Sequence, residues 1–332
     1  MRKLYISILK IIAIWMVFNF HYIIIVEKET ILFGFANGDW GAVGTTLFLL
    51  ISGNSLARKY GNKLNVKEFY KKRWLAIFPM FYLCYFFAFV LHRIILQNGF
   101  FTNVKPWTIL FTLLGIDNYM SLLGIPNNAI IGEWYTAIIV TLYLLFPLIQ
   151  LLYRKKPVMA TAVIMIMYGL NLVLNIGNLI DDAHLITGLA MFWIGMLTYK
   201  YEEKIQNVAL PVKIVVFLSA LVLMLVKVPG ITLLYKNLMG ILIFVIFMFW
   251  GKLIDSADEP LPIRFLCKIE YGIYLCHHAV MYVMEAIFEK FFGRMYPVGY
   301  YFASLVATII FSTFLYYCIN FKEILHLKKN NK

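Results

Sequence analysis

The chain has 332 residues, of which 62% are hydrophobic and 14% are charged, and its mean hydropathy is +0.79. Water-soluble domains are about 45–50% apolar and about 25% charged. The composition therefore excludes a soluble enzyme, a nucleic-acid-binding domain and a disordered chain. Thirty Lys and Arg against 17 Asp and Glu give a net charge of +13, and basic loops on the cytoplasmic side of a membrane explain this excess.

Eleven apolar stretches are candidate membrane spans, because a helix needs about 20 residues to cross a bilayer. They occupy residues 4–26, 41–57, 74–96, 107–124, 133–153, 158–176, 184–200, 211–228, 231–250, 269–290 and 299–321. The first is too long for a cleavable signal peptide and has no small-residue cleavage site, so we expect it to span. The fourth is the weakest candidate, because Gly115, Asp117, Asn118 and Gly124 interrupt it.

Loop charge predicts which stretches cross. The N-terminus carries Arg2 and Lys3, and the loop 58–73 carries seven Lys and Arg against one acid. The positive-inside rule therefore places both in the cytoplasm. The basic segment 154–156 is also cytoplasmic only if 107–124 does not span. The loops 200–213 and 252–268 are then predicted to be cytoplasmic as well. The sequence thus predicts an all-α integral membrane protein with about ten spanning helices, one non-spanning outer segment and both termini in the cytoplasm.

The domain organisation expected from this topology is simple. Residues 1–325 form one membrane domain and residues 326–332 form a basic cytoplasmic tail.

The first helix carries the clearest candidate site, since ionisable residues within spans are costly and are functional candidates. Lys10 and His21 are eleven residues apart, which places them on one helix face about 16 Å apart. Lys3 and Ser7 fall on the same stripe. The alternative interpretation is that Lys10 extends to the cytoplasmic headgroups and that His21 lies in the outer interface.

Other polar residues have ordinary explanations beside the functional one. Ser52 lies in a helix rich in small residues, where close helix packing is favoured. Glu133 and Trp134 open the fifth apolar stretch, as a helix cap and an interfacial aromatic would. The basic loop 58–73 either sets the topology or binds an anion such as coenzyme A or a nucleotide.

The last polar group lies in the stretch 269–290. Glu270, Tyr274 and His277 recur at i, i+4 and i+7 and share a face, whereas the adjacent His278 points about 100° away. An interhelical hydrogen bond is the alternative role for this face. The chain has no His-Glu-x-x-His pattern, and we expect no metal site.

Five segments in chain order carry a family resemblance. Lys10 with His21 is similar to an Arg-x10-His signature, and 48–58 is similar to Phe-x3-Ser-Gly-x4-Arg. The segments 70–79, 133–147 and 268–277 resemble a basic run ending in Pro, a Trp-aromatic…Tyr-Leu-x-x-Pro helix and Lys-Ile-Ser-Tyr-Gly-Ile-Tyr-Leu-x-His. Together they resemble integral-membrane acyltransferase family 3, whose members modify bacterial surface polysaccharides.

Three positions depart from the family pattern. Lys10 replaces an Arg, Ala76 replaces the second Arg of an Arg-x-x-Arg pair, and Glu270 replaces a Ser. These changes concern donor binding more than the class of reaction. We expect the stand-alone form of the family, without a C-terminal soluble domain.

The resemblance implies an enzyme of the bacterial cytoplasmic membrane. It would transfer an acyl group, by default acetyl, from cytoplasmic acyl-CoA to a hydroxyl of a surface or lipid-linked polysaccharide, with no permanently bound cofactor. His21 would act as general base or acyl carrier, and Lys10 would orient the donor or stabilise negative charge. Arg73, Lys72 and Arg58 would bind acyl-CoA. Ser52, Glu133, Trp134, Tyr274 and His277 would line the pore or acceptor side.

Two other interpretations stay open on the sequence alone. A transporter or flippase for lipid-linked glycans would use the same polar stripes as a solute path, although the chain shows no inverted repeat. A non-catalytic membrane component of a polysaccharide synthesis complex is the third, because Lys10 and Ala76 depart from the family pattern.

Overall fold

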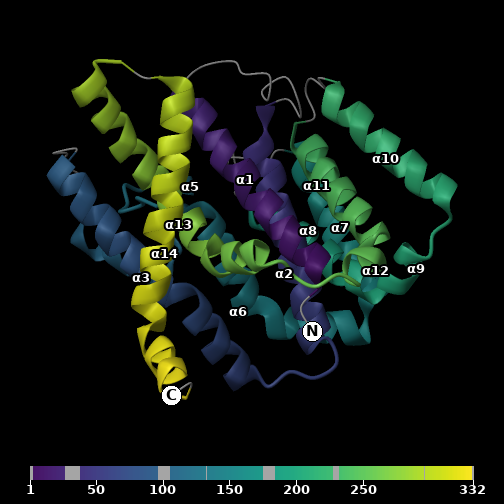
Figure 1. Ribbon diagram of the computed structural model, residues 1–332. Coiled ribbons are helices and arrows are strands. Elements are labelled where there is room, and N and C mark those ends of the chain that lie inside the picture. The colour runs from purple at the N-terminus through teal and green to yellow at the C-terminus, as the bar shows by residue number, and fades with distance from the viewer. Residues whose placement is uncertain are drawn as a thin grey trace. The chain divides into compact units, whose positions relative to one another are not determined.

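A computed structural model describes residues 3–26, 38–95, 105–131, 133–174, 184–226, 232–294 and 296–330. Every regular element in these ranges is a helix (Figure 1). They are α1 (Leu4–Val26), α2 (Trp40–Tyr60), α3 (Val66–Ile95), the short 3-10 helix η3 (Pro106–Thr108), α4 (Ile109–Leu114), α5 (Asp117–Leu122), α6 (Glu133–Lys155), α7 (Pro157–Leu174), α8 (Leu185–Lys200), α9 (Glu202–Gln206), α10 (Leu210–Leu225), α11 (Thr232–Phe249), α12 (Gly251–Ile254), α13 (Leu261–Phe292) and α14 (Pro297–Asn330).

Six of the described helices are long and apolar enough to cross a membrane. Their spanning parts are Leu4–Val26, Trp40–Tyr60, Val66–Leu91, Trp134–Lys155, Pro157–Leu174 and Pro297–Phe321. Leu185–Lys200, Leu210–Leu225 and Leu233–Phe249 are apolar but shorter. The protein is therefore an all-α, multi-pass membrane protein. The number of crossings and the side on which each terminus lies stay predictions.

The segment 107–124 does not form a spanning helix. It folds into α4 and α5, each six residues long, and about 9 Å of helix cannot cross a hydrocarbon core of about 30 Å. Gly115, with a φ of 68°, ends α4, because a left-handed residue after a helix favours glycine. The sequence predicts this interruption correctly, and the outer position of the segment stays a prediction.

This short segment and the chain that follows it are attached to α3 by two tyrosines. The hydroxyl of Tyr82 donates to the Leu113 carbonyl at 2.6 Å, and that of Tyr85 donates to the Asn128 carbonyl at 3.0 Å. Both bonds satisfy backbone carbonyls outside regular helix hydrogen bonding, where an apolar surrounding makes an unpaired group costly.

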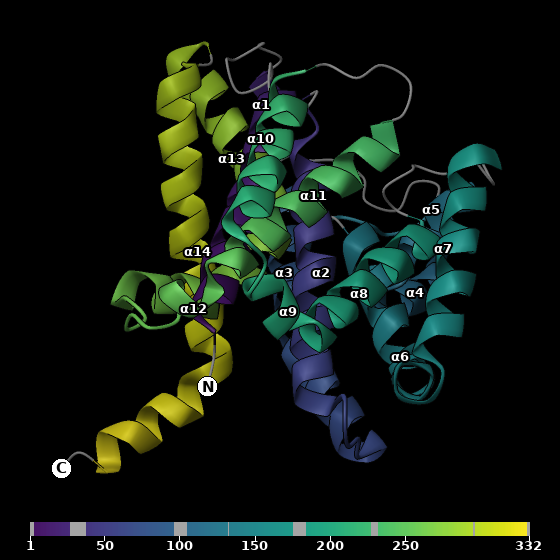
Figure 2. The same cartoon turned by 90° about the vertical axis from the view of Figure 1, so that its right-hand side faces the viewer.

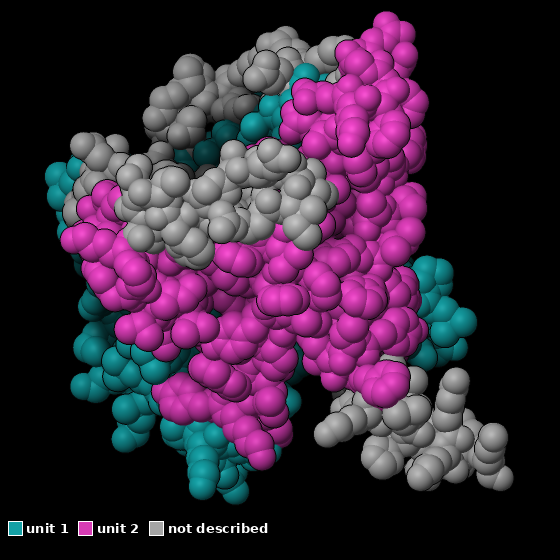
Figure 3. All heavy atoms as spheres, turned by 90° about the vertical axis from the view of Figure 1, so that its left-hand side faces the viewer, with its two compact units in different colours: residues 1–69, 135–264 teal, residues 70–134, 265–332 magenta. Residues whose placement is uncertain are grey.

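The chain divides into two compact units (Figure 3). Unit 1 comprises residues 1–69 and 135–264, and unit 2 comprises residues 70–134 and 265–332. The boundaries fall within α3, α6 and α13, so each of these helices contributes to both units.

In unit 1, α2 packs against α1, α8 and α11 (Figures 1 and 2). The crossing of α2 and α8 is very close. A methyl group at Gly53 would overlap the carbonyl oxygen of Phe192, and one at Gly195 would overlap that of Leu50. Small residues permit such backbone approach in membrane helices. This contact explains the small residues around Ser52 by packing.

In unit 2, α13 and α14 also meet through small residues. Ser304, Thr308 and Ser312 recur every four residues on α14 and are fully buried. The Cys276 sulfur lies 3.2 Å from the Ser312 hydroxyl, and Gly272 faces the same serine. Close packing of this stripe compensates for the weak hydrophobic drive between helices in lipid.

Candidate functional site

The N-terminus and four loops that are predicted to be cytoplasmic meet at one end of unit 1. The beginning of α1, the turn after α2, the ends of α6 and α8, and α9 with α12 surround an open cavity of about 700 Å³. Lys3, Arg154, Lys200 and Lys252 are its cationic lining residues. We call this cavity the basic pocket. Its composition shows that these loops lie on the same side of unit 1.

Two ion pairs neutralise part of the charge at the basic pocket. Lys3 Nζ lies 3.0 Å from the Asp255 carboxylate, and Arg58 pairs with Glu202 at 2.8 Å. Arg154, Lys200 and Lys252 are exposed and share the lining with Glu203. The pocket therefore keeps a positive balance after the pairs are formed.

Arg58, predicted to bind acyl-CoA, is held by the protein itself. Its Nη2 donates to Glu202 at 2.8 Å, to the Asn54 side-chain oxygen at 3.3 Å and to the Tyr5 hydroxyl at 3.4 Å. Its guanidinium also lies 4.8 Å from the ring centroid of Tyr199. These contacts connect α1, α2, α8 and α9, so Arg58 is a packing centre of unit 1.

The polar stripe of α1 divides into two parts. Lys3 pairs with Asp255, and the buried Ser7 hydroxyl donates to Glu259 at 2.7 Å. These two residues anchor the start of α1 to the segment before α13. Lys10 and His21 lie further along the helix and are half-buried, and the His21 ring meets the edge of Phe20 at 5.1 Å.

Ser52 is used in packing between helices. Its hydroxyl lies 2.9 Å from that of Tyr143 on α6, and neighbouring Gly53 forms the close contact with α8. The structure thus supplies the packing role that the sequence favours for Ser52. Tyr143 belongs to the same Tyr-Leu-x-x-Pro segment of the resemblance.

In unit 2, α13 presents a column of rings that includes Tyr274 and His277. The rings of Tyr271 and Tyr274 stack with centroids 6.4 Å apart, and Tyr274 lies 6.2 Å from His277. His277 is buried, and its Nδ1 lies 2.7 Å from the Tyr274 carbonyl. A carbonyl can only accept, so Nδ1 carries the proton and Nε2 is the basic nitrogen of neutral His277.

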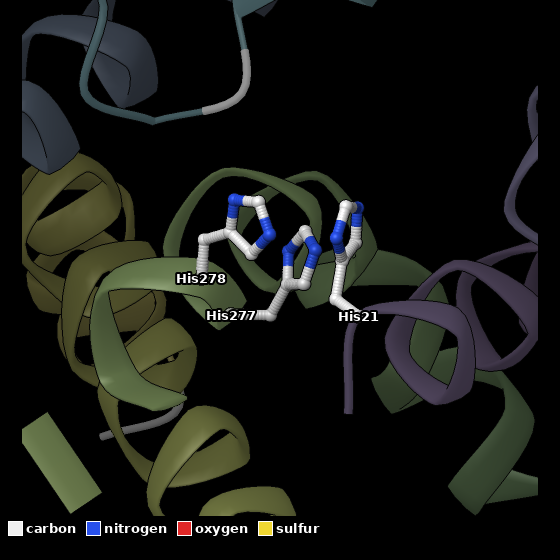
Figure 4. A group of neighbouring side chains, drawn as sticks. All are labelled: His21, His277 and His278. Carbon is white, nitrogen blue, oxygen red and sulfur yellow. The ribbon is translucent and has the colours of Figure 1, made fainter. Parts of the chain in front are cut away.

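His278 comes closer to His277 than its helical position predicts. The two rings stack with centroids 5.1 Å apart and planes at 29°. The 100° separation applies to the Cα–Cβ directions, whereas the side-chain torsions bring the rings together. Figure 4 draws both rings on α13, together with His21 from α1 of unit 1.

The remaining predicted residues lie in unit 2 as well. Lys72 is exposed and Arg73 is half-buried on α3, and half-buried Trp134 lies in the first turn of α6. Glu133 begins α6, and its side chain is outside the described part of the structure. The roles predicted for these four residues stay predictions.

A buried carboxyl group lies in the non-spanning segment. Asp117 accepts a hydrogen bond from the Thr112 hydroxyl at 2.8 Å and is fully buried. Burial raises the pKa of Asp117 to about 6, although the Thr112 bond acts in the opposite direction. The uncharged form is therefore accessible in mildly acidic solution.

Sequence reasoning missed most of the basic pocket. The sequence uses Arg154, Lys200 and Lys252 only to predict which side of the membrane their loops lie on. No pattern in the sequence marks Tyr153 or Gln206 as a binding residue. The useful signal was the predicted common side of the loops 154–156, 200–213 and 252–268, since residues on one side of a compact helix bundle are available to one cavity.

These observations define a class of protein: an all-α, multi-pass membrane protein with a basic pocket at one end of unit 1 and a histidine-bearing helix in unit 2. Its sequence matches the family model described as an acyltransferase domain over residues 3–317. The chain therefore belongs to acyltransferase family 3, as its motifs predict. No curated protein and no solved structure matches it.

Proposed function

We propose that this protein is a membrane O-acyltransferase of the bacterial cytoplasmic membrane. It transfers an acyl group, by default acetyl, from cytoplasmic acyl-CoA to a hydroxyl of a cell-surface or lipid-linked polysaccharide. The observation that carries the proposal is the acyltransferase family match over residues 3–317. The half-buried Lys10 and His21 on α1 support it, because they are the positions similar to the family's first-helix signature.

In the proposed reaction, His21 removes the proton of the acceptor hydroxyl while that oxygen attacks the thioester carbonyl. A C–O bond forms, the C–S bond breaks, and the proton passes from the imidazolium to the coenzyme A thiolate. Such general-base assistance contributes about 10²–10⁴-fold to a rate. Lys10 lies about 16 Å from His21 along the helix, and its role in this reaction is to orient the acyl-CoA donor.

The acceptor side is assigned to Ser52, Glu133, Trp134, Tyr274 and His277. Among these residues, His277 gives the most direct support. Its Nδ1 donates to the Tyr274 carbonyl, so Nε2 is the ring nitrogen that can accept a hydrogen bond or a proton. Lys72 and Arg73 remain the donor-binding residues that the family resemblance implies. The contacts of Arg58 with Glu202 favour a positioning role for Arg58 over direct donor contact.

The test compares surface polysaccharide from cells with the natural gene, a deletion, His21→Ala and His184→Ala. His184 is the matched control, because its Nδ1 accepts from the Ile186 amide at the start of α8. Proton NMR of the purified polymer should show an O-acyl signal with the natural gene and with His184→Ala, and none in the deletion or in His21→Ala. Equal membrane levels of the variants are checked by immunoblot.

Other results would overturn the proposal. An O-acyl signal that persists in the deletion would exclude the gene as its source. Loss of the polymer itself, without any gene-dependent acyl signal, would instead favour a transporter or a component of the synthesis complex. Full acylation with His21→Ala would leave the acyltransferase class intact and remove His21 as the base.

A further inference from the structure

The basic pocket has the size and openness of a ligand site. Its volume of about 700 Å³ lies within the range of about 300–1,000 Å³ typical of small-molecule sites. All residues that line it belong to unit 1 and come from six different parts of the chain. None of the individually predicted site residues is among them, and the loop 58–73, a candidate anion site in the sequence, contributes only the uncharged Gly61 and Asn62. The cationic lining of the pocket is therefore a site that the sequence did not assign.

The charges of the pocket suit several phosphate oxygens. The pairs Lys3–Asp255 and Arg58–Glu202 are internal, which leaves Arg154, Lys200 and Lys252 beside the single carboxylate of Glu203. An Arg fork and two Lys ammonium groups bind phosphate by charge-assisted hydrogen bonds. The three cations come from α6, α8 and α12, so a ligand with more than one phosphate can engage them together.

Aromatic rings in the same lining suit a planar base. Tyr153 packs edge-on against Trp193 with centroids 6.1 Å apart, and Tyr199 lies under the Arg58 guanidinium at 4.8 Å. Both rings are thus fixed by the protein before a ligand arrives. A nucleic base stacks on such rings whatever its identity, because every base has a π-face.

A buried amide in the lining points to a further polar contact. Gln206 is 8% exposed and lines the pocket, and its Nε2 has no hydrogen-bond partner among the described residues. Its backbone carbonyl is fixed by Lys213 Nζ at 3.0 Å. Buried polar atoms in proteins are nearly always paired, so a ligand acceptor would complete this site.

We infer that the basic pocket binds a phosphorylated nucleotide, and specifically the adenosine 3′,5′-bisphosphate part of the acyl-CoA donor. Arg154, Lys200 and Lys252 engage the phosphates, a tyrosine ring supports the base, and Gln206 donates to a base acceptor. The identity of the nucleotide rests on the proposed function. An anionic lipid headgroup shares the phosphate chemistry but offers no planar ring for Tyr153 and Tyr199.

Binding of adenosine 3′,5′-bisphosphate to the full-length protein tests the site without any turnover. The protein is placed in nanodiscs of neutral phosphatidylcholine and titrated by calorimetry. The double variant Arg154→Gln/Lys200→Gln should raise Kd about 10- to 100-fold, as loss of hydrogen bonds between charged groups does. Lys155→Gln/Lys204→Gln is the matched control, since it removes one positive charge from each of the same two loops outside the lining. Its Kd should equal that of the natural protein.

Several outcomes would overturn the inference. It fails if the natural protein binds no adenosine 3′,5′-bisphosphate, and it fails if both double variants bind this probe equally well. The inference also fails if, in a second set of nanodiscs that contain phosphatidylglycerol, this lipid blocks binding of the probe to the natural protein and to the control. That result would assign the pocket to a lipid headgroup.

Turnover separates this inference from the proposed function. If acylation occurs, Arg154→Gln/Lys200→Gln should raise KM for acetyl-CoA and leave KM for acetyl-pantetheine, which lacks the nucleotide, unchanged. If the probe binds as expected but no acyl transfer is found, the nucleotide site stands and the proposed function fails. If acyl transfer occurs without variant-dependent probe binding, the proposed function stands and the nucleotide site fails.

Discussion

The basic end of unit 1 and the ring column of α13 in unit 2 use costly polar residues in different ways. At the basic end, Arg58 makes contacts to Glu202, Asn54, Tyr5 and Tyr199. Its guanidinium therefore holds four helices together. On α13, the backbone carbonyls of Ile273 and Tyr274 orient His277 through Nδ1 and leave Nε2 as its basic nitrogen. Arg58 thus has a structural role in unit 1. In unit 2, by contrast, the backbone holds the His277 ring in one tautomer, with Nε2 as its basic nitrogen.

A second contrast lies within the basic end itself. Arg58 and Arg154 are both arginines near the end of a membrane helix that leads to this side. Arg58 is partly buried and paired with Glu202, whereas Arg154 is exposed and lines the basic pocket. The number of positive charges in a loop therefore does not tell which cation is available to a ligand.

The largest expected effect is on α13. His277→Ala and His277→Asn should each lower acyl transfer about 10²-fold, because both remove Nε2, the nitrogen that we assign to positioning the acceptor for attack. The Asn variant places an amide donor where Nδ1 lies, so it should keep the bond to the Tyr274 carbonyl and the thermal stability of the natural protein. Initial rates and melting curves of the purified variants check this.

The comparison would change if His277→Asn kept most of the activity while His277→Ala lost it. The important feature of His277 would then be the hydrogen bond from Nδ1. Its role would be structural, like that of Arg58 in unit 1.

The next effect concerns the helix contact on which the Arg58 network depends. Gly53→Ala should lower the free energy of unfolding by about 3 kcal/mol, as strong overpacking does, because the added methyl overlaps the Phe192 carbonyl. Separation of α2 from α8 would also stretch the bond from Asn54 to Thr198, now 3.1 Å. SDS titration in micelles measures the change.

Gly169→Ala on α7 provides the control, since nothing lies within 4 Å of an added methyl there. It should be neutral or slightly stabilising, as Ala favours a helix over Gly. Equal losses in both variants would show that helix flexibility, and not the close crossing, explains the effect.

The smallest effect is expected at the ion pair. Arg58→Met or Glu202→Gln should each lower the free energy of unfolding by about 2 kcal/mol, the scale of a hydrogen bond to a charged group. The double variant should lose less than the sum, because neither partner is left charged and unpaired. Double-mutant analysis by SDS titration measures the coupling.

Strict additivity of the two changes would contradict a structural pair. If Arg58→Met instead left stability unchanged and raised only KM for acyl-CoA, the donor-binding role predicted from the sequence would be restored.

The sequence determined the class of fold and the interruptions in it. Long apolar runs must form helices in a bilayer, because every backbone polar group needs a partner within the segment. Gly115 and Gly124 correctly marked 107–124 as too broken to span. The order of motifs from Lys10 to His277 identified the family, since motif order along the chain needs no knowledge of contacts.

Only the tertiary structure decided which of the polar residues are available. Glu202 is 144 residues from Arg58, and no periodicity in the sequence predicts a pairing over that separation. The same holds for Gln206, which becomes a buried lining residue of the basic pocket through the packing of α9. Charge and helical face are local properties of a sequence, whereas ion pairing and burial depend on which distant helices meet.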